Sequence, residues 1–391
     1  MSSIRLRISL AVVTLAVIFV FAALPVAHAQ TFSVVYTFGT GTDGTLPTGL
    51  LLGSDGNLYG TTLRGGTHNV GTVFKVDTTG TETILYNFTG GADGGQPNAD
   101  MIRDTNGNFY GTTSLGGGTG CNDGCGTVFN LTPTGHIHTL HSFSGGAENH
   151  GVFNGLTSFN GELYGTSDLV NGEIYKISRG GAYQLLYSFT DGADGMEPGP
   201  IVADSTGNLY GTTYTTPTSA GTVYKFDTAG NLNILYTFPN TQTTGGLPQA
   251  RLLLDVNGNI HGTTISGGKN NCNLDGGCGV VFRLSNTGTE TVAHRFGSIA
   301  DDGDRPGNLV DINGVLYGIT SLGGDLDDCK NQGCGTIFSI AGDGAYTVLY
   351  RFSGGSDGSQ PGNLIKDAAG NLYGIAARGG IGNGVVFKIA P

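Results

Sequence analysis

The sequence contains no tryptophan, and only 12% of its 391 residues are charged. Beyond the N-terminal segment it has no apolar run long enough to span a bilayer and no sustained helical period. It also lacks the G-x-S-x-G, H-E-x-x-H and phosphate-loop motifs of common hydrolases, zinc peptidases and nucleotide-binding proteins. The first two absences argue against a helical architecture. Without these motifs, the sequence offers no catalytic residues of the corresponding classes.

Positive charge is also scarce. The chain has 18 Lys and Arg against 30 Asp and Glu, which gives a formal net charge of −12. Such a balance argues against binding to nucleic-acid phosphates or to anionic lipid, because both need clustered cations. It fits a soluble exported protein. We therefore expect no nucleic-acid partner, and we expect a monomer.

Residues 1–29 have the pattern of a secretory signal peptide. Arg5 and Arg7 provide the positive start, residues 8–24 form the apolar run, and Ala27-His28-Ala29 is a small-x-small cleavage signal. The alternative is an uncleaved anchor helix, for which the run is only marginally long. We expect cleavage after Ala29, a secreted or periplasmic mature protein, and no membrane span in the mature chain.

What the sequence has in abundance is glycine, 71 residues of it, within a repeat. The tetrapeptide Tyr-Gly-Thr-Thr or a close variant recurs at intervals of roughly 50 residues. The copies begin at Tyr59, Tyr110, Tyr164, Tyr210, His261, Tyr317 and Tyr373. Each unit holds four short segments bounded by Gly, Asp, Asn or Pro: an apolar run, LYGTT, GTVF and LYxF. Seven units of four short strands predict an all-β, seven-bladed β-propeller of four-stranded antiparallel blades.

The two ends of the repeat array support a closed ring. Residues 31–38 (TFSVVYTF) are a fourth segment with no unit before them, and the chain stops after a third segment, GVVFKIAP. An open solenoid would instead need atypical capping repeats. We expect the N-terminal strand to complete the last blade, so that residues 30–391 form one domain.

The LYGTT, GTVF and F-x-G-G-x-D-G-x-x-P segments resemble the glycine-rich "GloVer" tandem-repeat family of secreted bacterial proteins, over nearly the whole mature chain. The D-x-x-G-N-L-Y segment is similar, more distantly, to NHL-type propellers. The resemblance implies the fold and an exported protein, and it supplies no catalytic residue. Members of that family carry varied C-terminal anchors, whereas this chain ends at Pro391 without an apolar tail, which argues against surface attachment.

Candidate site residues come from a position that varies between the units. Ten residues before each LYGTT Tyr or His, near the start of the innermost strand, the units carry different residues. Four of them, Asp100, Asn154, Arg251 and Asn363, could converge on a small ligand at the channel mouth. The alternative is a wet channel lined by whatever residues are tolerated.

The repeated Asp-Gly-x-x-Pro segment admits two interpretations. A ring of carboxylates could bind Ca²⁺ or sugar hydroxyls, but a calcium site needs six to eight oxygens around one point. One Asp per loop in separate blades cannot supply them, so turn formation is the favoured interpretation. We expect no metal site and no cofactor.

The six cysteines form three local pairs: Cys121 with Cys125, Cys272 with Cys278, and Cys329 with Cys334. Each pair lies just before a GTVF-type strand. Zinc would need four ligands around one point, and a thioredoxin-like pair has two intervening residues at a helix start. In an exported chain we therefore expect three local disulfides.

The favoured function is a secreted, non-catalytic binding or interaction module, with a glycan, a peptide or another protein as the extracellular ligand. The alternative is a propeller hydrolase or lyase with its site at the channel mouth around Asp100 and Arg251. Convergence of the four candidate residues on the channel would favour a site; side chains directed into the blades would oppose it.

Overall fold

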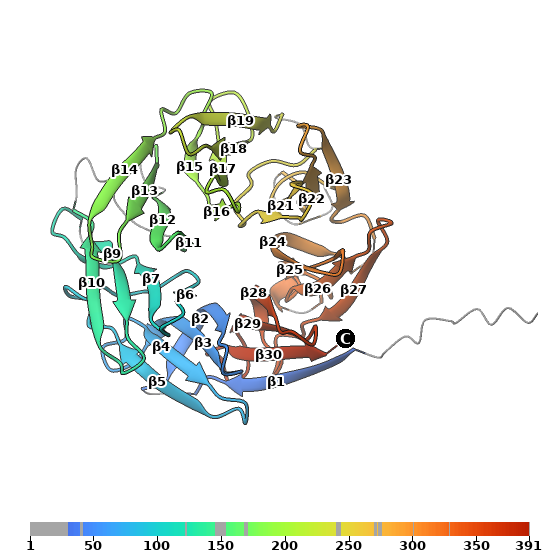
Figure 1. The fold of residues 1–391 in the computed structure, drawn as a ribbon. Coiled ribbons are helices and arrows are strands. Elements are labelled where there is room, and N and C mark those ends of the chain that lie inside the picture. The colour runs from blue at the N-terminus through green and yellow to red at the C-terminus, as the bar shows by residue number, and fades with distance from the viewer. Residues whose placement is uncertain are drawn as a thin grey trace, which may run out of the picture.

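The structure is a computed structural model that describes residues 30–39, 42–121, 123–144, 154–167, 171–239, 244–269, 272, 276–299, 301–327 and 329–390. The predicted signal segment, residues 1–29, lies outside the described residues. Seven small antiparallel sheets surround a central axis (Figure 1). This is the seven-bladed β-propeller that the repeat predicts.

Within each blade we call the strands A to D from the channel outward. Blade 1 consists of β2 (Gly44–Leu52), β3 (Leu58–Gly65), β4 (Thr72–Val76) and β5 (Glu82–Asn87). Blade 2 consists of β6 (Ile102–Arg103), β7 (Phe109–Thr113), β9 (Gly124–Leu131) and β10 (Ile137–Ser142), with β8 (Gly116–Gly117) beside β9. Blade 3 consists of β11 (Thr157–Phe159), β12 (Glu162–Ser167), β13 (Glu173–Ile177) and β14 (Tyr183–Ser188).

In blade 4 strand A is split into two pieces. The blade consists of β15 (Met196–Pro198), β16 (Val202–Ala203), β17 (Leu209–Thr215), β18 (Thr222–Phe226) and β19 (Leu232–Thr237). Blade 5 consists of β20 (Leu253–Leu254), β21 (Ile260–Thr264), β22 (Val280–Leu284) and β23 (Glu290–Arg295). Blade 6 consists of β24 (Gly303–Ile312), β25 (Val315–Gly323), the 3-10 turn η1 (Cys329–Asn331), β26 (Thr336–Ile340) and β27 (Tyr346–Arg351).

The ring closes through the N-terminal strand, as the ragged ends of the repeat predict. Blade 7 consists of β28 (Ser359–Lys366), β29 (Leu372–Arg378), β30 (Val385–Ala390) and, as strand D, β1 (Thr31–Thr37). β1 pairs antiparallel with β30, Thr31 opposite Ala390 and Thr37 opposite Val385. In Figure 1 the blue β1 lies beside the red β30, so both ends of the domain share one blade. No helix among the described residues is long and apolar enough to cross a membrane.

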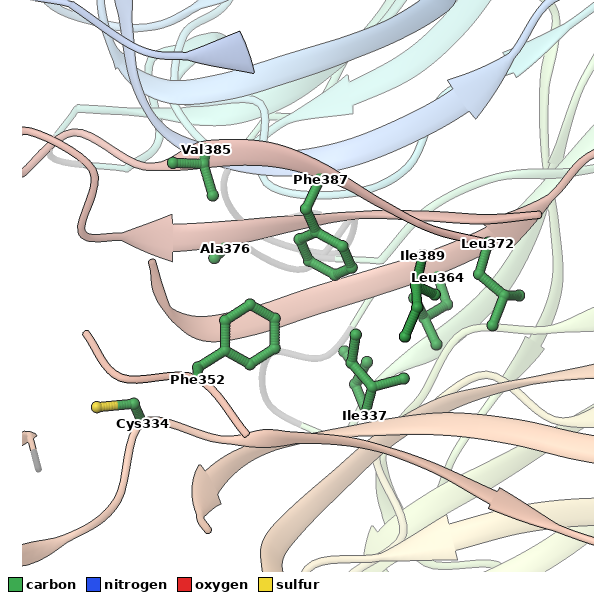
Figure 2. Packing of buried hydrophobic residues seen from close by; sticks show 10 residues of the cluster. Cys334, Ile337, Phe352, Leu364, Leu372, Ala376, Val385, Phe387 and Ile389 are labelled. Carbon is green, nitrogen blue, oxygen red and sulfur yellow. The ribbon is translucent and has the colours of Figure 1, made fainter. Parts of the chain in front are cut away.

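The hydrophobic core is divided among the seven seams between blades. Each seam has its own cluster of buried side chains, drawn from two neighbouring blades. At the seam between blades 6 and 7, Ile337 and Phe352 of one blade meet Leu364 and Phe387 of the next (Figure 2). Because both faces of a blade are covered in this way, its B and C strands are almost continuously buried, as in β7 and β4.

The glycine of LYGTT makes room for the aromatic ring of strand C. A Cβ added at Gly60 would lie 2.4 Å from Cζ of Phe74. In each of the other six blades, a Cβ added at the equivalent glycine would lie within 2.7 Å of the strand-C aromatic side chain. These glycines are Gly111, Gly165, Gly211, Gly262, Gly318 and Gly374. An ordinary side chain there would collide with the core ring, so the packing explains why the motif contains glycine.

The polar residues of the repeat are mostly used within the scaffold. In the A–B turn of blade 2, Asp104 accepts hydrogen bonds from the backbone N–H of Asn108 at 2.9 Å and from the Tyr110 hydroxyl at 3.1 Å. In the D–A loop that follows blade 1, Asp93 accepts hydrogen bonds from the Tyr86 hydroxyl at 2.9 Å and from the backbone N–H of Thr89 at 2.8 Å. The Asp-Gly-x-x-Pro carboxylate therefore has the turn-forming contacts of the favoured interpretation.

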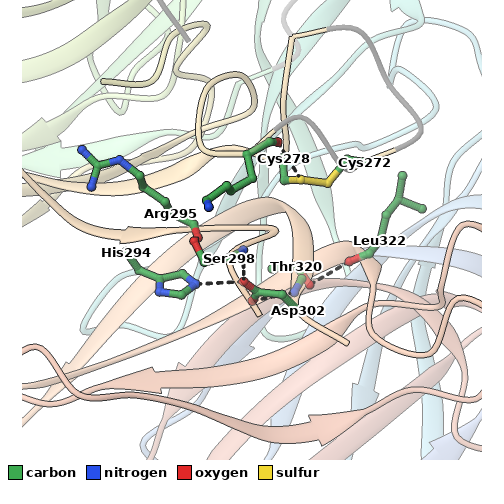
Figure 3. The surroundings of a disulfide bond; sticks show 10 residues. Cys272, Cys278, His294, Arg295, Ser298, Asp302, Thr320 and Leu322 are labelled. Carbon is green, nitrogen blue, oxygen red and sulfur yellow. Dashed lines mark hydrogen bonds and ion pairs between the residues drawn. A yellow bond between two sulfur atoms is a disulfide. The ribbon is translucent and has the colours of Figure 1, made fainter. Parts of the chain in front are cut away.

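All three cysteine pairs are joined as local disulfides, with Cα–Cα distances of 5.3, 5.5 and 5.3 Å. The second cysteine of each pair (Cys125, Cys278, Cys334) is buried at a seam. Figure 3 shows Cys272–Cys278 above the D–A loop that carries Asp302, whose carboxylate lies 3.2 Å from Nε2 of His294. The bridges hold B–C loops at the same face of the ring as the D–A loops.

Candidate functional site

A cavity of about 450 Å³ lies on the axis at the face that carries the D–A loops. Every blade contributes to its wall, mostly through residues at the start of strand A. The polar and charged members of the wall are Thr48, Asn98, Asp100, Asn154, Gln249, Arg251, Arg305, Asn308, Ser321 and Asn363. The four residues predicted from the sequence therefore all line one cavity.

Asp100 and Arg251 lie in the two blades that carry an extra residue before strand A. In blades 1, 4, 6 and 7, the next buried aliphatic residue stands three positions after the D–A loop proline, as from Pro47 to Leu50. In blade 2 the step from Pro97 to Met101 is one residue longer, and the same holds for blade 5. In both of these blades the innermost strand, β6 and β20, is only two residues long.

The neighbouring blades make room for the enlarged loop of blade 2. A Cβ added at Gly49 would lie 2.9 Å from Cα of Asp100, and one added at Gly155 would lie 3.2 Å from the carbonyl oxygen of Asp100. Glycines in blades 1 and 3 thus flank the acidic residue. The inward displacement of Asp100 is built from three blades.

Asp100 is the centre of a polar network across the channel. Its carboxylate interacts with the guanidinium of Arg251, the side-chain amide of Asn363 and the backbone N–H of Leu50, which lie in blades 5, 7 and 1. Burial raises the pKa of Asp100, and these three partners oppose the rise. Asp100 lines the cavity, and its exposure to solvent is intermediate.

Arg251 connects the network to three further elements. Its guanidinium donates a hydrogen bond to the carbonyl oxygen of Leu156 in blade 3 at 2.8 Å. Its backbone N–H donates to Oδ1 of Asn308 in blade 6 at 2.8 Å. Asn308 in turn donates from Nδ2 to Oδ1 of Asn363 at 3.2 Å. Side chains from blades 2, 5, 6 and 7 therefore form one connected set around the axis.

Asn154 lines the cavity but has a different set of partners. Its amide nitrogen donates to Oγ1 of Thr166 at 3.0 Å and to the carbonyl oxygen of Pro198 at 2.8 Å. In blade 1 the hydroxyl of Thr48 makes the same two kinds of contact, with Thr61 and with the carbonyl oxygen of Pro97. Asn154 thus joins blade 3 to blade 4.

Counting ten residues back from the repeat Tyr does not find Asn308. In blade 6 that count names Gly307, because the turn between Leu309 and Tyr317 is one residue shorter than in most blades. Comparison of the segments PGNL at 306–309 and 361–364 would have found it, since both place Asn directly before the buried leucine. Pattern matching around the core residue is thus more reliable than a fixed count.

The rim of the cavity carries a cation in an unusual backbone conformation. The residue before the D–A loop proline has a positive φ in six blades: Leu46, Gln96, Glu197, Leu247, Arg305 and Gln360, with φ between 51° and 57°. A residue before proline ordinarily avoids helical conformations, so the loop enforces this one. The backbone N–H of Arg305 is held by the carbonyl oxygen of Cys278 at 3.2 Å, and the disulfide Cys272–Cys278 fixes that carbonyl.

The charges of the wall sum to a positive value. Among its described residues there is one carboxylate, Asp100, against two guanidinium groups, Arg251 and Arg305. The Arg305 side chain is exposed, and its guanidinium makes no hydrogen bond with the described residues. Burial raises the pKa of the adjacent Asp304 to about 6, and Arg305 opposes that rise. The arrangement can bind and orient a polar molecule. Its carboxylate already accepts hydrogen bonds from Asn363 and from the backbone N–H of Leu50, and it interacts with the charge of Arg251.

The repeat itself identifies the family. The Gloeobacter/Verrucomicrobia repeat matches residues 20–169 and 167–387, which is nearly the whole chain. The protein belongs to the Gloeobacter/Verrucomicrobia repeat family. This confirms the resemblance in the LYGTT and GTVF segments. No protein among the curated sequences matches this chain.

Solved structures share the fold of this Gloeobacter/Verrucomicrobia repeat protein at low sequence identity. The extracellular domain of a protein assigned to a hybrid two-component system of B. thetaiotaomicron is 11% identical over 93% of this chain and 41% of its own, with a TM-score of 0.58. A second B. thetaiotaomicron extracellular domain, assigned to a one-component system, is 15% identical over 92% of this chain and 42% of its own, with a TM-score of 0.56. The chain thus spans about two fifths of the length of each.

A gluconolactonase from Xanthomonas campestris has a TM-score of 0.45, at 12% identity over 92% of this chain and 89% of its own. At this level of similarity it carries no argument about function. The two extracellular domains show the propeller fold and nothing finer.

Proposed function

We propose that the protein is an exported, non-catalytic binding module that takes a small polar ligand in the axial cavity. The observation that carries this proposal is the connected set of Asp100, Arg251, Asn308 and Asn363 around an open cavity. Only 12% of the residues in this chain are charged. The two blades with an extra residue before strand A nevertheless place opposite charges, Asp100 and Arg251, in the cavity that all seven blades line. A purely structural channel would not need charged side chains there.

Two further observations support export and binding. The three disulfides are stable in oxidising compartments such as the periplasm or the exterior of the cell. The repeat Tyr, Thr and Asp side chains are used for turns and seams, so the residues that differ between blades are the ones free to define a ligand. The cavity volume suits a ligand of one or two sugar rings or a short polar peptide.

The test is a screen of the mature protein, residues 30–391, against a panel of mono- and disaccharides, sugar acids, amino acids and dipeptides. Binding is measured as the ligand-dependent rise in the thermal unfolding midpoint. The account predicts at least one hit whose effect is lost in Arg251→Gln. The matched control is Arg283→Gln, which removes an exposed arginine of blade 5 away from the cavity.

Two outcomes of the screen would contradict the proposal. If hits stabilise wild type and Arg251→Gln equally, the ligand lies elsewhere on the molecule. If hits are chemically converted during incubation, the protein is an enzyme and the hydrolase or lyase alternative replaces the binding module.

A further inference from the structure

We infer that the axial cavity selects a hydroxylated carboxylate, that is, a small sugar acid, over the corresponding neutral sugar. This inference rests on the proposed function and names the chemical class of its ligand. It follows from which groups of the wall are already engaged and which are free.

The first step concerns charge. The described wall carries a net positive charge within a protein whose overall formal charge is −12. The protein as a whole repels anions, but a carboxylate that enters the cavity comes close to two guanidinium groups, those of Arg251 and Arg305. Arg251 has five N–H donors; one is bonded to the carbonyl oxygen of Leu156, and the guanidinium also interacts with the Asp100 carboxylate. The guanidinium of Arg305 makes no hydrogen bond with the described residues, and its charge also acts on the adjacent Asp304.

The second step excludes an ammonium ligand. A cation would need a free carboxylate, and Asp100 is already shared by Arg251, Asn363 and the Leu50 N–H. Among the described residues of the wall, the cavity offers donors for an anion, and its one carboxylate, Asp100, already has partners. Amino acids and amines are therefore disfavoured relative to acids.

The third step concerns hydroxyl groups. The wall carries amide side chains at Asn98 and Gln249 and a hydroxyl at Ser321. Oδ1 of Asn98 is buried and has no hydrogen-bond partner among the described residues. A buried acceptor without a donor costs stability, and a ligand hydroxyl would satisfy it. Guanidinium donors for a carboxylate, beside amide and hydroxyl groups for hydroxyls, are the set that a sugar acid requires.

The decisive residue is Arg305, and the chain itself provides the conservative replacement. Gln occupies the equivalent position in blades 2 and 7, where Gln96 and Gln360 adopt φ of 51° and 53°, close to the 57° of Arg305. Arg305→Gln therefore removes the charge while keeping a residue that this loop conformation accepts. Folding of the variant is checked by its thermal midpoint and by circular dichroism.

The experiment is isothermal titration of glucuronate and of glucose into wild type, Arg305→Gln and the control Arg283→Gln. The inference predicts that wild type and Arg283→Gln bind glucuronate at least about tenfold more tightly than glucose. Arg305→Gln should reduce that preference to about threefold or less, through weaker glucuronate binding. Added salt should weaken glucuronate and leave glucose unchanged.

Three results would overturn the inference. Equal affinity for glucose and glucuronate would remove the carboxylate preference while leaving a sugar-binding module in place. A preference that persists in Arg305→Gln would remove the assigned residue. If neither compound binds, the sugar-acid class is wrong, and hits of the wider screen among neutral sugars, amino acids or dipeptides then decide the proposed function independently.

Discussion

At the scale of single residues, the blades show what a core position tolerates because the same environment occurs seven times. Strand C carries Phe at the core aromatic position in five blades and Tyr in two, Tyr175 and Tyr224. Both hydroxyls are buried and have no hydrogen-bond partner among the described residues. Burial raises the pKa of both groups, so they stay neutral, and each is an uncompensated polar atom in an apolar seam.

Replacing Tyr224 by Phe should therefore stabilise the protein, by about 1 kcal/mol, because it removes an unpaired buried hydroxyl. The control is Tyr210→Phe, which removes a hydroxyl that donates to Asp204 at 3.2 Å and should be neutral or destabilising. Urea unfolding midpoints of both variants check the prediction. A loss of stability in Tyr224→Phe would show that its hydroxyl has a partner after all.

The LYGTT glycine gives the opposite kind of residue-scale prediction. Gly60→Ala places a methyl group against the ring of Phe74 and should cost about 1–3 kcal/mol, because neither strand can move independently of its sheet. Gly180→Ala is the control, since its nearest neighbour would be the Ser178 hydroxyl at 3.7 Å. Equal unfolding midpoints for the two variants would contradict the packing explanation.

At the scale of elements, the ring-closing strand β1 meets blade 1 at a seam with buried acidic groups. Glu82, at the start of β5, has a buried Oε1 without a partner among the described residues. Burial, followed by the charge of Asp43, raises its pKa to about 7. Tyr36 of β1 donates to Asp43 at 2.8 Å and feels both charges.

The pKa of Glu82 is higher in the folded state than its ordinary value of 4.5, so its protonated form favours folding. This contribution is complete below about pH 4.5 and is lost as the pH rises through about 7. The free energy of unfolding of Glu82→Gln should thus equal that of wild type near pH 4.5. At pH 8 it should be higher than that of wild type by about 1–2 kcal/mol, after allowance for partial solvent screening. Unfolding free energies at the two pH values check this; an equal difference at both would contradict it.

The sequence predicts elements well where the repeat is regular and less well where it is not. The strands can be predicted from the repeated segments, the disulfides from cysteines that are close in sequence, and ring closure from the incomplete first and last units of the repeat. The network of the site is harder, since Asn308 is displaced by a shortened turn and Asn154 serves a seam. Nothing local in the sequence says that Arg251 reaches Leu156 in blade 3, because that contact depends on the diameter of the ring.

At the scale of the whole molecule, stability depends on closure because the core is divided among seams. The seam between blades 7 and 1 uses Phe38 together with Phe74 and Val386, and Phe32 of β1 stacks on Tyr350 with ring centroids 3.9 Å apart. Without residues 30–39, two seams lose aromatic residues and β30 becomes an exposed edge.

Deleting residues 30–39 should lower the thermal midpoint by more than about 10 °C or yield aggregated protein, because several kcal/mol of buried aromatic surface is lost. The control is a circular permutant that begins at residue 42 and carries residues 30–39 after Pro391, joined by a four-residue turn copied from residues 227–230. Calorimetry and size-exclusion chromatography should show the permutant to behave like wild type. A deletion variant as stable as wild type would refute closure by β1.

The ring presents a polar cavity on its axis, and a ligand-bound structure shows whether that cavity is the binding site. A crystal structure of residues 30–391 with the strongest binder from the screen should show the ligand in the axial cavity, in contact with Arg251 and Arg305. Asp100, Asn308 and Asn363 should remain connected around it. A ligand bound at the outer strands or at the disulfide loop of blade 2, with an empty axial cavity, would contradict the account.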